Sequence, residues 1–113
     1  MSYSAPLFSD EELLAGFRTL ATREKYFTFI VRQHQKQIYW FIRRMVLNHD
    51  DANDLTQNVF IRVWENLDEF RGDSRLVYWI YRIATNTTFT FLNLKKKNLR
   101  LIFCGMSKRR SKR

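Results

Sequence analysis

One face of a helix predicted in the second half of the chain carries side chains suited to binding nucleic acid. Its members recur at steps of three and four residues, which places them on one stripe of a helix. The arginines could contact phosphates or base edges, Asn86 could read a base edge, and Trp79 could stack against a base. The alternative is that Trp79 belongs to the core and the polar residues are ordinary surface. The stripe consists of Arg75, Trp79, Arg82, Asn86, Thr90 and Asn93.

A second unusual face lies on a helix predicted over residues 51–67. One side of this helix is an apolar stripe that should be buried, but another side mixes polar residues with large apolar ones. A solvated helix face seldom carries Ile and Trp together, so we interpret this side as a contact surface for a partner. The alternative is that Phe60 and Trp64 simply pack on a neighbouring helix. The face consists of Asp54, Asn58, Ile61 and Glu65, flanked by Gln57, Phe60 and Trp64.

The formal net charge of +9 comes from the C-terminal end of the chain. Of the 20 Lys and Arg residues, nine lie at or after Lys95, whereas all 11 Asp and Glu residues precede it. Lys95, Lys96 and Lys97 extend the first stripe in positive charge and could contact phosphates without reading sequence. Basic residues next to aromatic ones suit single-stranded or unstacked nucleic acid better than an intact duplex.

The apolar periodicity predicts a small all-α bundle of four helices. A hydrophobic content of 45% and only three glycines agree with a folded, mostly helical chain. The helices are expected over residues 9–20, 22–47, 51–67 and 74–94. We divide the chain into an N-terminal extension (1–8), a helical domain (9–97) and a basic tail (98–113).

Polar residues at the helix ends predict where these helices begin. Ser9 and Glu12 form a capping box for the first helix, and Thr22 can cap the second. An Asn-His-Asp-Asp cluster at residues 48–51 opens the third helix, and Asp73 or Ser74 is expected to cap the fourth. The predicted buried stripe of the fourth helix is Leu76, Ile80, Ile83, Thr87, Phe91 and Leu94.

No pattern in the sequence indicates catalysis, a metal or a membrane. There is no paired carboxylate site, nucleophile with base or phosphate-cradling glycine loop, so we expect neither an enzyme nor a cofactor. Cys104 is the single cysteine and no Cys/His cluster has zinc spacing, while His34 lies on an apolar stripe and should be a core-edge histidine. No apolar run approaches the roughly 20 residues that span a bilayer, and no signal peptide is recognisable. We therefore expect a cytoplasmic protein.

Three blocks of the sequence resemble region 2 of bacterial RNA polymerase sigma factors, and most closely their compact extracytoplasmic-function group. The blocks are DDANDLTQNVFIRVW (50–64), FRGDS (70–74) and WIYRIATN (79–86), and they occur in the right order and at the right spacing. The resemblance covers roughly residues 9–97. It implies a compact helical domain that takes part in transcription initiation and performs no chemistry of its own.

The resemblance implies that the helix over residues 51–67 binds the clamp helices of the polymerase largest subunit. The residues carried over to this role are Asp54, Gln57, Asn58, Ile61 and Glu65. The family commonly has acids where this chain has Asn53 and Asn58. Because an exposed ion pair contributes at most about 1 kcal/mol, these two departures predict weaker binding to a basic partner rather than its loss.

The resemblance also implies that the FRGDS loop and the helix after it recognise and open the promoter −10 element. Phe70 with Arg71, Gly72, Asp73 and Ser74 would form a pocket for a base flipped out of the non-template strand. Asn86 would read base edges, Trp79 and Arg82 would support melting and hold the backbone, and the lysines would contact phosphates. The implied DNA-binding set is Phe70, Arg71, Gly72, Asp73, Ser74, Arg75, Trp79, Arg82, Asn86, Thr90, Lys95, Lys96 and Lys97.

A complete factor of this group carries a second helical domain, region 4, which binds the −35 element. Only 16 residues follow Lys97, so we expect that domain to be missing and the chain to be either a fragment or a natural short form. Two other functions stay open. One is a stand-alone basic module for single-stranded nucleic acid, and the other is a truncated decoy that binds polymerase or an anti-sigma factor.

Overall fold

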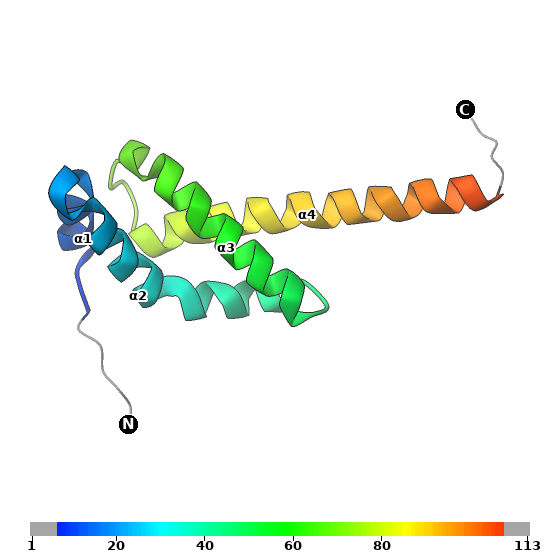
Figure 1. The fold of residues 1–113 in the computed structure, drawn as a ribbon, viewed down its shortest axis with the longest axis horizontal. Coiled ribbons are helices and arrows are strands. Elements are labelled where there is room, and N and C mark those ends of the chain that lie inside the picture. Colours follow the sequence, from blue (N-terminus) through cyan, green and yellow to red (C-terminus); the bar gives the residue numbers. More distant parts are fainter. Residues whose placement is uncertain (1–6, 108–113) are drawn as a thin grey trace, which may run out of the picture.

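The described part of the chain folds into a bundle of four α-helices, with two short 3-10 helices in the connections (Figure 1). The structure is a computed structural model that describes the backbone of residues 7–107 and the side chains of residues 7–97. Within this range it contains no strand, so the all-α prediction is confirmed. The elements are α1 (Asp10–Arg18), η1 (Leu20–Thr22), α2 (Arg23–Arg43), α3 (His49–Asn66), η2 (Leu67–Glu69) and α4 (Leu76–Ser107).

Two of the predicted helix starts are confirmed by their hydrogen bonds. The Ser9 N–H donates to Glu12 Oε1 at 2.9 Å, and the Glu12 N–H donates back to Ser9 Oγ at 3.1 Å. Asn48 caps α3, because its Oδ1 accepts the Asp51 N–H at 2.8 Å. Thr22 does precede α2, but its hydroxyl donates to the Gly16 carbonyl oxygen at 2.7 Å, so the prediction of a side-chain cap was wrong there.

The bounds of α2 and α4 differ from the prediction. Helix α2 ends at Arg43, four residues earlier than expected, and the chain turns to place Val46 in the core and Leu47 in solvent. Helix α4 continues to Ser107 instead of ending near residue 94, because lysine and leucine sustain a helix and no Pro or Gly intervenes before Gly105. Figure 1 shows this second half of α4 extending past the ends of α2 and α3. The remainder of the predicted tail, residues 108–113, lies outside the described residues.

A single apolar core draws on all four helices. Its fully buried members include Leu13 and Phe17 of α1, Ile38 of α2, Val59 of α3 and Ile80 of α4. Burying each such side chain contributes about 1.5–3 kcal/mol. Helix α1 packs mainly on α2, and α4 packs on both α2 and α3.

The buried side of α4 is rotated from the predicted stripe. Leu76, Ile80 and Thr87 are buried as expected, but Ala84 and Thr88 are buried too. Because α4 lies against both α2 and α3, its contact follows the row of residues four apart, where small side chains let the helices approach closely. Ile83 and Phe91 are consequently only partly buried, and Leu94 is 56% exposed.

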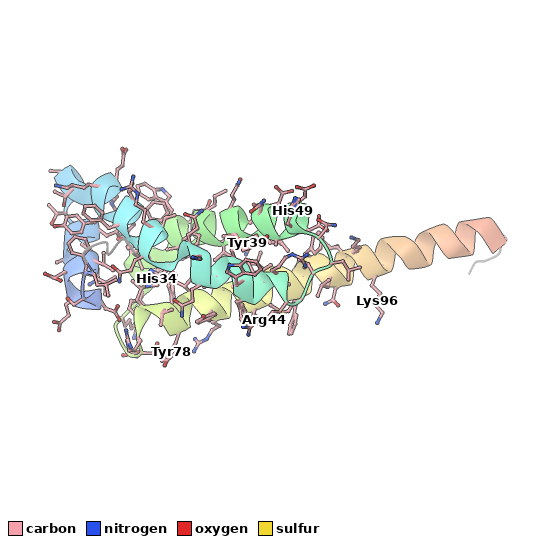
Figure 2. All side chains as sticks on the ribbon, turned by 90° about the horizontal axis from the view of Figure 1, so that it is seen from below. His34, Tyr39, Arg44, His49, Tyr78 and Lys96 are labelled. Atoms are coloured by element: carbon pink, nitrogen blue, oxygen red, sulfur yellow. The ribbon has the colours of Figure 1, made fainter. Side chains whose placement is uncertain are left out.

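His34 is a core histidine, as its place on the apolar stripe predicts. Its ring is buried between the helices (Figure 2), and Nδ1 lies 2.8 Å from the Ile30 carbonyl oxygen one turn earlier. Burial lowers the pKa of His34, and the hydrogen bond to Ile30 only partly opposes this effect. The imidazole is thus neutral at physiological pH, with an Nδ1–H that donates to the carbonyl.

Candidate functional site

The loop between η2 and α4 exposes polar side chains and begins with a buried aromatic residue, Phe70. Phe70 is buried and its ring lies 5.2 Å from that of Trp79, centroid to centroid, at an interplanar angle of 49°. Phe70 thus supports the loop from beneath. Gly72 has φ +81°, a left-handed conformation that glycine adopts without strain, and the chain reverses there. The residues that the loop exposes are Arg71, Gly72, Asp73, Ser74 and Arg75.

Both ends of this loop are held by α1. At the start, Arg18 Nη2 donates to the Phe70 carbonyl oxygen at 2.7 Å. At the end, the Leu76 N–H donates to Asp10 Oδ2 at 2.8 Å, and Arg75 Nε lies 3.8 Å from the same oxygen. The prediction that Asp73 or Ser74 caps α4 was therefore wrong, since the carboxylate comes from a residue 66 positions earlier. Local sequence pattern cannot detect a cap so distant in the chain.

A polar stripe runs from the loop along α4, as the spacing predicts. Arg82, Asn86, Thr90 and Asn93 are exposed on it. Trp79 is partly buried, and its ring contacts Phe70. The alternative that Trp79 belongs to the core is therefore correct only in part. Exposed aromatic surface lies beside the stripe at Tyr78 and Phe89. Figure 2 shows Tyr78 near the loop and Lys96 where α4 extends beyond the other helices, so the surface runs along the bundle from one end to the other.

The three lysines continue the stripe, and one of them already has a partner. Lys95, Lys96 and Lys97 are all exposed. Lys95 Nζ lies 3.5 Å from Asp51 Oδ2 on α3 and 5.6 Å from the centroid of the Phe91 ring. Its charge is thus partly offset in the unbound protein, whereas Lys96 points away from the bundle (Figure 2).

The second predicted contact surface is exposed along α3. Its members are Asp54, Gln57, Asn58, Ile61 and Glu65. Ile61 is 55% exposed and is the large apolar side chain of this otherwise polar face. Phe60 and Trp64 behave differently: Phe60 is buried, and Trp64 packs edge-on against Phe27 at 5.0 Å. The alternative that these two aromatic residues pack on neighbouring helices is therefore correct.

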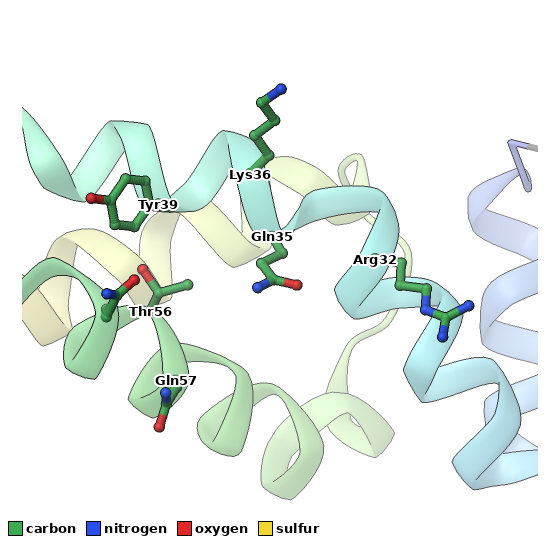
Figure 3. Close-up of a pocket in the computed structure, with 7 residues that line it drawn as sticks. Arg32, Gln35, Lys36, Tyr39, Thr56 and Gln57 are labelled. Carbon is green, nitrogen blue, oxygen red and sulfur yellow. The ribbon is translucent and has the colours of Figure 1, made fainter. Parts of the chain in front are cut away.

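Two shallow grooves border this face where α3 lies against α2. One has a volume of about 390 Å³ and is mostly apolar, with Ile61 at its edge. The other, of about 350 Å³, is lined mainly by polar and charged residues and is drawn in Figure 3, where Arg32 and Lys36 come from α2 and Gln57 from α3. The α3 face and the adjoining α2 surface thus combine apolar, amide and charged groups, as in a protein-binding surface rather than a catalytic pocket.

Groups suited to a metal or a bilayer are not found in the part of the chain that the structure describes. No three His, Cys, Asp or Glu residues there lie close enough together to hold a metal ion. No helix there is both long and apolar enough to cross a membrane.

The chain is similar in sequence to known proteins over its central part. A family model described as Sigma-70 region 2 matches residues 30–98. Over 70 residues the chain is 39% identical to the ECF RNA polymerase sigma factor SigW of Bacillus subtilis. The matched segment covers 62% of this chain and 37% of that protein. Over 69 residues it is 38% identical to the ECF RNA polymerase sigma-E factor of Escherichia coli, with 61% and 36% covered. The chain thus spans about a third of the length of these relatives.

A solved structure has the same fold. It is the NMR structure of an engineered region 2 of sigmaE in complex with GTAAAA. The superposition has a TM-score of 0.73 at 26% identity and covers 85% of this chain and 98% of that one. It includes more of this chain than the sequence matches do.

Proposed function

This chain belongs to the sigma-70 region 2 family, and we propose that it binds core RNA polymerase through α3 and captures the opened −10 strand of a promoter through the loop and α4. The observation that carries the proposal is the continuous surface from the exposed loop at residues 71–75 along Arg82 and Asn86 to the lysines. The same fold is found in the engineered region 2 of sigmaE in complex with GTAAAA.

The groups on this surface suit a single strand whose bases are unstacked. Unstacking and flipping a base costs a few kcal/mol, and a base that stacks on an aromatic side chain regains about 1–3 kcal/mol. The backbone and side chains of the loop, above the ring of Phe70, would receive the flipped base. Asn86 can donate to and accept from a base edge, which gives sequence preference. The lysines add an attraction to phosphates that depends on salt and not on sequence.

The α3 face would meet the clamp helices of the polymerase largest subunit. Asp54 and Glu65 supply charge, Gln57 and Asn58 supply amide hydrogen bonds, and Ile61 supplies an exposed apolar anchor. An anti-sigma factor that covered this face would compete with polymerase. The proposed function places the chain in the cytoplasm, where polymerase and promoter are found.

A pull-down with core polymerase, or with a fragment that contains its clamp helices, tests the α3 assignment. Replacing Asp54 and Gln57 together by alanine removes a charge and an amide from the centre of the face and should abolish retention. The matched control replaces Glu24 and Gln37, an exposed acid and an exposed amide of α2, and should leave retention unchanged. Equal retention of the two double variants would remove the polymerase role from α3.

Enrichment of a random single-stranded DNA library on the immobilised protein tests the strand assignment. The proposed function predicts that one short motif is enriched, and we refer to the resulting oligonucleotide as the preferred strand. A library that emerges without any motif, although it binds, would favour a basic module for single strands of any sequence. A library that does not bind at all would favour a decoy for polymerase or an anti-sigma factor.

A further inference from the structure

We propose that Asp10 and Arg18 of α1 are positioning residues, which hold the loop at residues 70–75 in the shape that captures the strand. The inference rests on the proposed function of that loop. Both residues lie before residue 30, where the match to the family model begins. Neither would be chosen from the sequence as part of a nucleic-acid surface, since one is acidic and both lie far from the loop in the chain.

The two hydrogen bonds fix the loop at its two ends. Arg18 donates to the carbonyl oxygen of Phe70, the first loop residue, at 2.7 Å. Asp10 accepts the N–H of Leu76, the residue directly after the loop, at 2.8 Å. Hydrogen bonds with a charged partner are about twice as strong as neutral ones, and the Asp10 side chain is only 27% exposed, which limits screening by water.

The loop itself has weak means of holding its shape. Its residues from Arg71 to Ser74 are exposed, and Gly72 gives the backbone freedom at the point of reversal. A side-chain hydrogen bond inside the loop, from Ser74 Oγ to the Arg75 carbonyl oxygen, is long at 3.4 Å. Together with the burial of Phe70 and Leu76, the two bonds to α1 therefore set where the base-capturing groups lie relative to Asn86 on α4.

Helix α1 is a suitable support because it is itself anchored firmly to α2. The Gln33 side chain bonds both backbone groups of Phe8, accepting from its N–H at 3.0 Å and donating to its carbonyl oxygen at 3.1 Å. The Phe8 ring stacks on Phe29 at 4.7 Å, and Leu13 and Phe17 are fully buried. Because α1 is fixed to α2, its two hydrogen bonds hold both ends of the loop in place relative to the bundle.

Fluorescence titration with the preferred strand and with an unrelated strand tests the inference. Asp10→Ala and Arg18→Met should each reduce the ratio of the two affinities by about tenfold, the effect of losing a charged hydrogen bond. Asp10→Asn keeps an acceptor oxygen and should retain most of the preference. The matched controls are Glu11→Ala, an exposed acid in the same helical turn, and Lys25→Met, an exposed cation of α2; both should leave the ratio unchanged.

Hydrogen exchange of the Leu76 amide, read in the same variants, separates positioning from simple stability. The inference predicts faster exchange in Asp10→Ala together with the lost preference, at a temperature where circular dichroism shows each variant folded. Faster exchange with an unchanged affinity ratio would overturn it and leave the bonds a structural role. If the wild-type protein enriches no motif, the proposed function fails and strand positioning fails with it, while the exchange data still show whether Asp10 holds the loop.

Discussion

Three aromatic residues next to the two candidate surfaces support them from within. Phe60 and Trp64 flank the exposed residues of α3 yet pack inward, and Phe70 lies beneath the loop that it was expected to line as a pocket. Their large apolar area explains this placement, because an aromatic ring that can reach the core gains more by burial than by exposure. On α3, the residues that stay exposed are Ile61 and the polar residues that lie near these aromatic side chains.

The buried His34 should make stability depend on pH. Its pKa is lower in the folded protein than the value of 6.5 for a free side chain, so the unfolded chain takes up the proton first as the pH falls. The contribution of neutral His34 is complete above pH 6.5 and is lost as the pH falls below it. Urea unfolding at about pH 7.5 and at about pH 5 measures the difference.

Two variants isolate this contribution from that of the carboxylates. His34→Gln, which keeps a donor for the Ile30 carbonyl oxygen, should weaken the pH dependence of the unfolding free energy. His49→Gln removes the other histidine, which is exposed and whose Nε2 lies 3.6 Å from Asp50 Oδ1; losing this solvent-exposed pair should change the profile less than His34→Gln does. Identical pH profiles for the wild type and His34→Gln would contradict a neutral, buried imidazole.

Gly16 is required for the close approach of α1 to α2. A Cβ at this position would collide with the ring of Tyr26, which itself packs against Phe8 and Phe29. Gly16→Ala should therefore destabilise the protein by about 1–3 kcal/mol through overpacking. In an open helix the same change would stabilise by about 0.5–1 kcal/mol, so the sign of the change in thermal unfolding decides the point.

At the scale of the elements, periodicity and capping residues were enough to find all four helices. The capping box at Ser9 and the cap at Asn48 are local patterns, and the sequence carries them in full. The start of α4 could not be predicted in the same way, because its N-terminal N–H bonds to Asp10 on another helix. Its buried stripe was partly wrong for a related reason: contact with two helices at once, rather than hydrophobicity alone, sets which side is buried.

Asn48 should contribute measurably to the stability of α3. Its side chain accepts the Asp51 N–H, and replacing such a cap by alanine typically costs about 1 kcal/mol. Asn48→Ala should lower the unfolding free energy by that amount in urea titrations. Asn53→Ala changes an exposed asparagine within the same helix and should be neutral or slightly stabilising; an equal loss in both variants would contradict a specific cap.

At the scale of the whole molecule, the two surfaces lie on different helices of one small core. The sequence predicted the exposed residues of both surfaces, since spacing alone places them on a common face. It did not predict that α1 holds the loop, because those contacts join residues 52 and 66 positions apart. The fold therefore carries the proposed protein-binding face and the proposed strand-binding face on one core, and contacts with the first helix hold the loop of the second.

The most direct test of the account compares the preferred strand with its complement in a fluorescence titration. The wild type should bind the preferred strand at least about tenfold more tightly than the complement. Asn86→Ala should lower this preference by about 1–3 kcal/mol, the contribution of a bidentate base contact. Asn93→Ala, an exposed asparagine two turns along the same stripe, should keep more of the ratio. Equal affinity for the two strands, or a ratio that survives Asn86→Ala intact, would contradict capture of the −10 strand by this surface.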